Sequence, residues 1–319
     1  MLHDPGDVYF RAGKQLKNHK EMPNFIVTSL PAYVQENRDL LIKNFALVGG
    51  ETRKRISVQT GIKKDEYINY LNLTPTFQSG VGCGFNAQGD ATLTQRLIET
   101  ARFKVNMEIC PDTLIGKYAE YQVAINASEN ASLPFEAFIM EALGNEIVKK
   151  IETTIWQGVK ASDLIDGFLT IAGKESDVVD VVIGGESAYA DILAVYNKMT
   201  ENTLEQGGEI YVSPAKFRSF MQEMVVKNYF HYNPGNAEPS EFILPGSNVK
   251  VVRTTGLTGK TEILGTFPKN MFYGCDTENA AEDIKVWYSD DDDVIKIAAK
   301  WNMGVQFAFP GEVVLGATA

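Results

Sequence analysis

The stretch that decides the fold is PFEAFIMEALGNEIVKKIETTIWQ, residues Pro134–Gln157. Its apolar residues recur at intervals of three and four, the spacing of one face of an α-helix: Phe135, Phe138, Ile139, Ala142, Leu143, Ile147, Ile151 and Ile155. Pro134 suits the first helical turn, and Gly158 stands where a left-handed terminating residue is expected. The pattern predicts a helix roughly 36 Å long. Charged residues on its other faces exclude a membrane span, so this helix must lie along another long element.

Length and composition favour a globular protein without a secretory signal. The chain has 319 residues, enough for two compact regions, and it contains no run of 18 apolar residues. The N-terminus, MLHDPGDVYFRAGKQLKNHK, has no apolar core of the kind that a signal peptide needs. The three cysteines form no CxxC pair. We therefore expect reduced thiols in a cytoplasmic product, and neither a disulfide framework nor a zinc site.

The net charge of −11 is unevenly distributed along the chain. Residues 1–110 carry 14 Lys and Arg against 11 Asp and Glu, whereas residues 111–319 carry 16 against 30. A dedicated nucleic-acid reader normally has a strong basic patch, and this composition argues against one. The asymmetry instead suggests that basic N-terminal parts meet an acidic surface on another copy of the chain.

The first third of the chain predicts an arm followed by a long β excursion. Residues 1–24 are basic with few apolar anchors, which indicates an extended arm or a simple disordered terminus. A short strand at 25–29 and a helix over about 34–45 follow. Residues 53–109 are rich in Thr, Ile, Val, Tyr and Phe and partly alternate, which is typical of strands. A Gly-rich stretch, Gln78–Asp90, interrupts them. Such an excursion cannot bury both of its faces alone and needs a neighbour.

The remainder predicts an α/β region followed by a returning pair of strands. A short helix is expected around Leu114–Ile125, before the long helix. From Ser176 strands and helices alternate: strands at 177–184 and 209–214, helices at 187–202 and 215–229. Residues 231–248 are predicted to form a loop, and residues 249–267 a hairpin around Gly256–Lys260. Near the end, alternating runs at 284–288 and 294–301 flank the four aspartates Asp290–Asp293.

Two motifs invite a ligand-binding interpretation, and both fit a structural one better. The Gly-rich stretch contains GxGxG, but a strand-like run follows it, and the chain has no GK[ST]. A structural loop is therefore favoured over a phosphate-binding loop. Asp290–Asp293 have oxygen ligands that suit Ca²⁺ or Mg²⁺, but their spacing is not that of an EF-hand. A solvated hairpin tip is the favoured interpretation.

The sequence shows no catalytic constellation. Of the three histidines, His3 and His19 lie in the expected arm, and His231 is interpreted as a capping or packing residue. Cys110 precedes a proline and has no partner visible in the sequence, so a buried structural thiol is expected. Hydrolase, metalloprotease and kinase signatures are all missing from the sequence. We therefore assign no catalytic, cofactor-binding or metal residues and expect neither an enzyme nor a cofactor.

The order of these parts resembles the tailed-phage major capsid proteins of the Hong Kong 97 type. The segments that carry the resemblance span residues 25–319. They are INYLNLTPTFQSGVGCGFNAQGDATLTQRLIET, KVNMEICPDTLIGKYAEY, the 134–157 helix, EIYVSPAKFRSFM, VKVVRTTGL and IAAKWNMGVQFAFPGEVVL. These segments look most like the capsid proteins of phages that infect Bacteroidetes, including the crAss-like group. No single motif is as specific as a catalytic signature, and the resemblance rests on several segments in the same order.

The resemblance implies an α+β fold with named parts. These are an N-terminal arm and short helix at 1–50, an E-loop at 51–109, and a P domain at 110–175 containing a spine helix at 134–157. The remaining parts of the fold are an α/β A domain at 176–274 and a P-domain sheet at 275–319. The apolar face of the spine helix should then meet the sheet formed by residues 284–301.

The resemblance also implies a function in self-assembly. Subunits of this family form hexamers and pentamers that tile an icosahedral shell around double-stranded DNA. Partners would be other copies of the chain, and portal, scaffold and decoration proteins, with non-specific contact to DNA and no membrane. The protein would be located in the virion capsid, which would be assembled in the cytoplasm of the host bacterium. Some members form Lys–Asn cross-links; Lys63 and Lys64 lie in the excursion, but no matching motif is present. An encapsulin-like compartment and, more remotely, a soluble enzyme are the alternatives.

Overall fold

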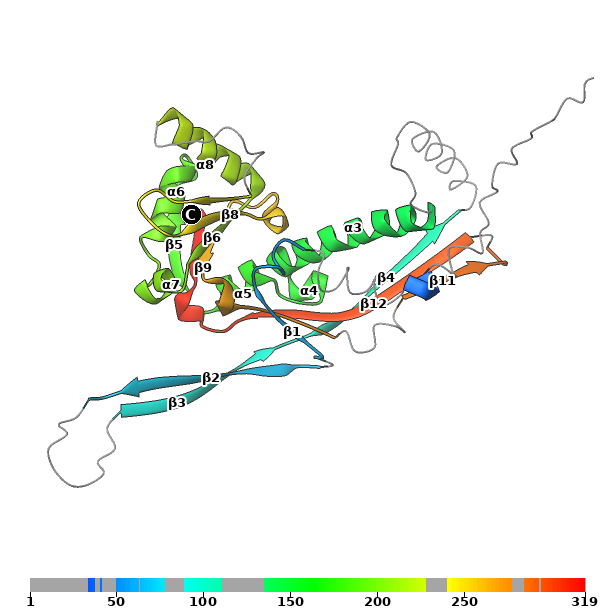
Figure 1. The fold of residues 1–319 in the computed structure, drawn as a ribbon, viewed down its shortest axis with the longest axis horizontal. Coiled ribbons are helices and arrows are strands. Elements are labelled where there is room, and N and C mark those ends of the chain that lie inside the picture. The colour runs from blue at the N-terminus through cyan, green and yellow to red at the C-terminus, as the bar shows by residue number, and fades with distance from the viewer. Residues whose placement is uncertain are drawn as a thin grey trace, which may run out of the picture.

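The computed structural model describes residues 34–37, 41, 50–62, 64–77, 89–110, 135–227, 240–276, 284–292 and 294–318. The expected arm at 1–24, the strand at 25–29 and the helix near 114–125 lie outside these ranges. Most of the helix expected at 34–45 and residues 78–88 of the Gly-rich stretch also lie outside them. The described residues form a five-stranded sheet, a six-stranded sheet, a separate two-stranded ribbon, and helices (Figure 1).

The long helix predicted from the sequence is present as α3, Phe135–Gln157. Its buried apolar residues include Leu143, Ile147, Ile151 and Ile155. Two expectations for this helix were wrong: Ala142 is exposed, and the charged residue Glu152 is buried. In the part of the chain that the structure describes, no helix is both long enough and apolar enough to cross a membrane.

Gly158 follows α3 for a reason other than the expected one. Its backbone N–H donates to the carbonyl oxygen of Thr154 at 2.9 Å, and its φ angle is not positive. A Cβ at this position would lie 2.5 Å from the carbonyl oxygen of Thr154 and 2.9 Å from that of Ile165. Two backbone carbonyls therefore approach so closely that only glycine fits. The left-handed conformation predicted for Gly158 was wrong.

The five-stranded sheet is built around one long strand. This strand, β12 (Val294–Phe307), has β10 (Met271–Asp276) and β11 (Ile284–Ser289) in succession along one side and β4 (Ala101–Ile109) along the other, all antiparallel. The short strand β1 (Ser57–Thr60) pairs in parallel with β10. The predicted hairpin with the aspartates at its tip is confirmed as β11–β12.

Helix α3 lies along this sheet, as Figure 1 shows. Buried residues of α3 share one hydrophobic cluster with Ile295, Ile297, Ala299 and Met303 of β12. The expected contact between the helix and residues 284–301 is therefore confirmed. Strand β4 adds to the same surface through Phe103 and Val105, although sequence analysis placed it in the 51–109 excursion. Pairing with β12 along nine residues holds β4 in the sheet.

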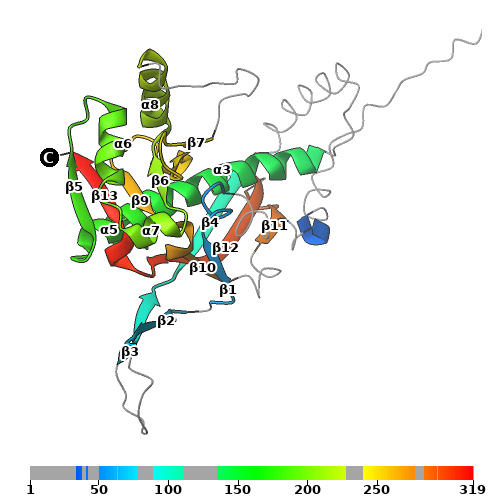
Figure 2. The ribbon, with the colours of Figure 1, turned by 60° about the vertical axis from the view of Figure 1, so that its left-hand side comes forward.

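The rest of that excursion forms an isolated ribbon. Strands β2 (Glu66–Pro75) and β3 (Gly89–Ile98) pair only with each other among the described strands, in antiparallel register over their whole length. Two views 60° apart show the ribbon projecting away from both sheets (Figures 1 and 2). The two-stranded part of the excursion is therefore shorter than residues 51–109, because β1 and β4 belong to the five-stranded sheet.

The α/β region contains the six-stranded sheet. Its order is β5 (Val179–Ile183), β13 (Val314–Thr318), β9 (Ile263–Thr266), β6 (Glu209–Val212), β8 (Lys250–Arg253) and β7 (Glu241–Ile243). Helices α6 (Ala188–Tyr196) and α8 (Pro214–Val226) pack against one face, and α7 (Glu201–Glu205) lies beside them. Ile210 and Val212 belong to the hydrophobic cluster of α6 and α8, whereas Tyr211 belongs to that of α3. Successive side chains of a strand point to opposite faces of the sheet, and both faces are buried at β6.

Two sequence predictions for this sheet were wrong. The predicted hairpin at 249–267 does not form, because β6 lies between β8 and β9 and pairs with both. The turn Thr255–Leu257 packs instead against the end of α3, where the side chain of Gln157 donates to the carbonyl oxygen of Gly256 at 2.6 Å. The predicted loop at 231–248 contains the short strand β7, which extends the sheet by pairing with β8.

A chain of aromatic side chains joins the two sheets. Trp156 of α3 contacts Tyr211 of β6 and Phe168, with ring centroids 5.1 and 5.5 Å apart. Phe168 begins α5 (Phe168–Lys174) and contacts Phe307 of β12, with ring centroids 5.0 Å apart. These four side chains are fully or almost fully buried. One continuous apolar core therefore extends from the six-stranded sheet through α3 and α5 to the five-stranded sheet.

Candidate assembly surfaces

The ribbon β2–β3 carries large side chains with no covering element among the described residues. Tyr67 is 57% exposed, and Phe77, just after β2, is 99% exposed. An isolated two-stranded sheet is marginally stable in water, and exposed aromatic residues are unfavourable there. The ribbon is therefore a structure that a contact with another molecule would stabilise.

The base of the ribbon is fixed to the five-stranded sheet by a small apolar cluster. Ile62, Ile68 and Ile98 are buried together, and Phe272 of β10 packs against them. A Cβ at Gly274 would lie 2.6 Å from the side chain of Ile62, so a glycine allows this close approach. The backbone N–H of Thr100 also donates to the Asp65 carboxylate at 3.2 Å. The base of the ribbon is therefore anchored in the body of the protein.

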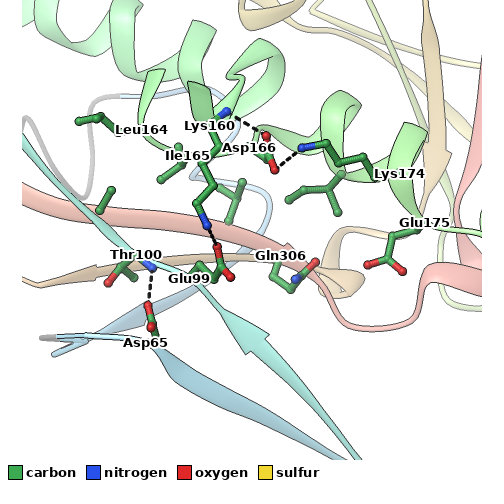
Figure 3. A pocket seen from close by; sticks show the side chains of 13 residues that line it. Asp65, Glu99, Thr100, Lys160, Leu164, Ile165, Asp166, Lys174, Glu175 and Gln306 are labelled. Carbon is green, nitrogen blue, oxygen red and sulfur yellow. Dashed lines mark hydrogen bonds and ion pairs between the residues drawn. The ribbon is translucent and has the colours of Figure 1, made fainter. Parts of the chain in front are cut away.

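Charged side chains surround a cleft of about 470 Å³ beside this base (Figure 3). Lys160, at the start of α4 (Lys160–Asp163), forms an ion pair with Glu99 at the end of the ribbon. Across the cleft, Asp166 accepts hydrogen bonds from the backbone N–H of Lys160 at 2.9 Å and from Lys174 Nζ at 2.6 Å. The charged groups of the cleft are thus engaged with one another. This arrangement suits the positioning of the ribbon.

A second, more apolar groove of about 410 Å³ runs between α3 and the sheet. It is lined by Leu143, Ile147 and Ile151 of α3 and by Phe103 and Trp301 of the sheet, among others. The rings of Phe103 and Trp301 stack with centroids 6.1 Å apart. Helix and sheet therefore leave an open apolar channel along part of their contact.

The face of the five-stranded sheet that points away from α3 is basic. Residues on alternate positions of the three strands β4, β11 and β12 carry its cations: Arg102, Lys104, Lys285, Lys296 and Lys300. The same face has the carboxylate of Glu108 and the exposed ring of Trp287. Asp292, at the hairpin tip, forms an ion pair with Lys296. On a chain with a net charge of −11, this face is suited to an acidic partner surface.

The residues that sequence analysis considered for chemistry do not come together among the described residues. Cys110 is exposed, so the prediction of a buried thiol was wrong; it is the last residue of its described segment and follows β4 directly. Asp290, Asp291 and Asp292 are exposed at the hairpin turn. The described residues contain no cluster of three or more metal-ligating side chains. His3, His19, His231, Lys63 and Asp293 lie outside the described ranges, and Lys64 is exposed.

A carboxylate on α8 caps the first turn of α6, a contact that sequence analysis missed. Glu223 accepts hydrogen bonds from Ser187 Oγ at 2.5 Å and from the backbone N–H groups of Ala188 at 2.6 Å and Tyr189 at 3.2 Å. Partial burial alone would raise the pKa of Glu223, but these hydrogen bonds and nearby Lys227 outweigh it and lower the pKa. The contact ties the two helices on the outer face of the six-stranded sheet together.

We expect Glu223→Gln to reduce stability at neutral pH and to have little effect in acid. A lowered pKa in the folded state stabilises the protein above the unfolded-state value of 4.5, and this stabilisation is lost as the pH falls through the folded-state pKa. Urea midpoints measured between about pH 7 and pH 3 should therefore converge for the wild type and the variant. Glu186→Gln, at an exposed position before α6, is the control. A constant difference between wild type and Glu223→Gln at every pH would contradict the assignment.

Comparison with known proteins shows a fold shared with solved structures at low sequence identity. No protein-family model matches the chain, and no curated protein matches it. A capsid chain of a native GTA particle is 10% identical, with 84% of this chain and 89% of that chain covered and a TM-score of 0.57. A chain of Gordonia phage Cozz is 12% identical, with 84% and 86% covered and a TM-score of 0.53. A chain of the satellite phage P4 procapsid, whose structure includes the size determination (Sid) protein, is 14% identical, with 91% and 98% covered and a TM-score of 0.52.

These likenesses establish the fold of the chain. The chain has an α+β fold of the Hong Kong 97 type, as the order of segments in the sequence predicts. The match extends over most of the chain and most of each capsid chain, so it includes both sheets and is not restricted to one of them.

Proposed function

We propose that this chain is the major capsid protein of a tailed bacteriophage. It would assemble as hexamers and pentamers into an icosahedral shell around double-stranded DNA. The observation that carries the proposal is the fold shared with chains of a capsid and a procapsid over 84% and 91% of this chain. Sequence segments that resemble crAss-like phage proteins support, as a narrower proposal, a phage that infects Bacteroidetes.

The same proposal assigns each part of the fold a role in assembly. We assign residues 1–50 to the N-terminal arm, and residues 51–109 to the E-loop, with the β2–β3 ribbon as its projecting part. Residues 110–175 and 275–319 form the P domain, with α3 as its spine helix, and residues 176–274 form the A domain. The exposed aromatic residues of the ribbon support this assignment, since no described element of the chain covers them and a neighbouring subunit would.

The distribution of charge supports self-association. The basic sheet face includes Arg102 and Lys104 from the first third of the chain, whereas residues 111–319 carry 30 acidic against 16 basic residues. Opposite charges on two copies would steer and align their association. The excess of acidic residues also suits a shell that holds DNA without gripping it, because phosphate binding requires many cations. We propose non-specific contact with DNA, and portal, scaffold and decoration proteins as further partners.

We propose that the protein acts without catalysis, in the virion capsid, after synthesis and assembly in the bacterial cytoplasm. Described charged residues pair with one another at the ribbon base and beside α3, and Glu223 is engaged by the hydroxyl and backbone N–H groups at the start of α6. The pKa of buried Cys275 is raised to about 11 by burial, which makes this thiol unreactive at neutral pH.

Electron microscopy of the purified full chain tests the proposal. We expect closed shells, or lattices of hexamers and pentamers, when the protein is expressed with its phage partners, and DNA inside shells recovered from infected cells. Particles that contain a packaged enzyme and no DNA would support an encapsulin-like compartment instead. A protein that remains a monomer or small oligomer under all of these conditions would overturn the proposal.

A further inference from the structure

Residues 50–55, GETRKR, contact α3 on one side and the six-stranded sheet on the other. Residues 51–55 form turns just before β1, closed by hydrogen bonds from the N–H groups of Arg55 and Ile56 to the carbonyl oxygen of Thr52, at 2.9 and 3.2 Å. Thr52 and Arg53 are buried, Arg55 is partly buried, and Lys54 is exposed. We call residues 50–55 the clasp.

One side of the clasp is bound to α3. Trp156 Nε1 donates to Thr52 Oγ1 at 2.7 Å in the buried core. Arg53 Nε lies 3.7 Å from Glu152 Oε1, and the two side chains are 0% and 4% exposed. A Cβ at Gly50 would lie 1.7 Å from the same Glu152 oxygen, so the backbone of the clasp approaches the carboxylate directly. The Arg53 guanidinium also stands over the ring of Tyr273 in β10, 5.7 Å from its centroid.

The other side of the clasp is bound to the six-stranded sheet. Arg55 extends two nitrogen atoms to two strands: Nη1 lies 3.2 Å from Glu209 Oε1 in β6, and Nη2 lies 2.6 Å from Glu241 Oε2 in β7. Glu241 is also 3.3 Å from Lys250 Nζ of β8. Burial would lower the pKa of Arg55, but the hydrogen bond and charges of these carboxylates raise it, which keeps the guanidinium charged.

The clasp and the aromatic chain constrain the molecule in different ways. The contact of Trp156 with Tyr211 and Phe168 is apolar and constrains orientation less strictly than a charge-assisted hydrogen bond, so it tolerates small rotations. A guanidinium that bridges two carboxylates has a fixed geometry. The Arg55 side chain is 23% exposed and that of Glu241 40%, so ions in solution reach this bridge. The Arg53–Glu152 pair on the other side is shielded from salt by its burial.

We propose that residues 50–55 are a salt-sensitive clasp that fixes the angle between α3 and the six-stranded sheet. The buried Thr52 and Arg53 anchor it on α3, and the Arg55 bridge sets the angle. Loss or screening of the bridge leaves α3 and both sheets folded and lets α3 and the six-stranded sheet rotate slightly relative to each other at the contact of Trp156 with Tyr211, which we call the joint. This role does not depend on what the chain assembles into.

Hydrogen-exchange mass spectrometry on the full chain tests the clasp. The reporting amides are Thr254 and Leu257, whose N–H groups bond to the carbonyl oxygens of Val212 and Thr254 beside the joint. In the wild type, raising NaCl from about 0.05 to about 0.5 M should speed their exchange by about 3–10-fold, with α6 amides unchanged. Arg55→Met should exchange fast at both salt concentrations, and Arg55→Lys should recover part of the salt response.

Lys54→Met is the matched control, because Lys54 belongs to the same turn, is exposed and forms no ion pair with a described residue. It should behave as the wild type. Glu241→Gln removes one carboxylate at a partly exposed position and serves if Arg55→Met does not fold; it should also weaken the salt response. If Arg55→Met and Glu241→Gln showed the exchange rates and the salt response of the wild type, the proposal would be overturned. An equal rise in the exchange rates of the Thr254 and Leu257 amides and of the α6 amides would also overturn it. The bridge would then stabilise the whole fold, and it would not specifically fix the angle between α3 and the sheet.

Discussion

Trp156→Ala should lower the free energy of unfolding by about 3–5 kcal/mol, the largest effect we expect from a single substitution. Trp156 is completely buried and contacts both Tyr211 and Phe168, so its removal opens a cavity where the two sheets meet. Its indole N–H is also the donor to Thr52, whose hydroxyl would lose this partner. Urea unfolding of unassembled subunits, followed by circular dichroism, measures the loss.

Trp287→Ala is the matched control for this prediction, because that indole is 44% exposed on the outer sheet face. It should change the free energy of unfolding by less than about 1 kcal/mol. Trp156→Phe keeps most of the apolar volume without the hydrogen bond, and an intermediate loss is expected. Equal losses for Trp156→Ala and Trp287→Ala would show that the aromatic chain does not join the two sheets energetically.

A subunit with a shortened ribbon should fold normally and fail to form shells. Tyr70 of β2 lies opposite Thr94 of β3, so replacing residues 71–93 with Asn-Gly allows a two-residue turn in the same register. The basal cluster of Ile62, Ile68 and Ile98 stays intact, and we expect the urea midpoint of the subunit to remain close to that of the wild type. Assembly would lose the ribbon, which among the described elements is the one that projects from the body, and particle counts by electron microscopy should fall to background.

Tyr67→Ser provides a milder test of the same surface. Tyr67 is 57% exposed near the ribbon base, and its loss should reduce shell yield without changing the fold. Its control is Val182→Ser on the edge strand β5, an exposed apolar residue outside the ribbon. Shells of normal yield from the shortened-ribbon subunit would refute the role of the ribbon in assembly.

The parts of the fold that were predictable from the sequence depend on local periodicity. The three-and-four spacing in α3 and the alternation of β11 and β12 each lie within one element. The errors concern pairing between distant segments. No local pattern shows that β4 joins β12 and not β3, or that β6 separates β8 from β9. Both arrangements depend on contacts between segments far apart in sequence.

The candidate surfaces were predictable in outline only. A Gly-rich, two-stranded excursion that needs a neighbour is visible in the sequence, and the ribbon agrees with it. The clasp was not predicted, because its basic residues read as part of a β-type run. A buried Arg53 becomes understandable only when Glu152 and Tyr273, more than ninety residues away, are placed beside it. Similarly, nothing local marks Glu223 as the cap of another helix.

The position of β12 and β13 in the sheets has a consequence for synthesis. The central strand of the first sheet and an interior strand of the second both come from residues 294–318. At about 5–20 residues per second, a ribosome needs roughly 10 to 30 s after finishing α3 to deliver them. Until then both sheets lack an inner strand, and the apolar side of α3 is only partly covered. A chain that ends before β12 therefore lacks an inner strand in each sheet, and we expect such a chain not to reach the native fold.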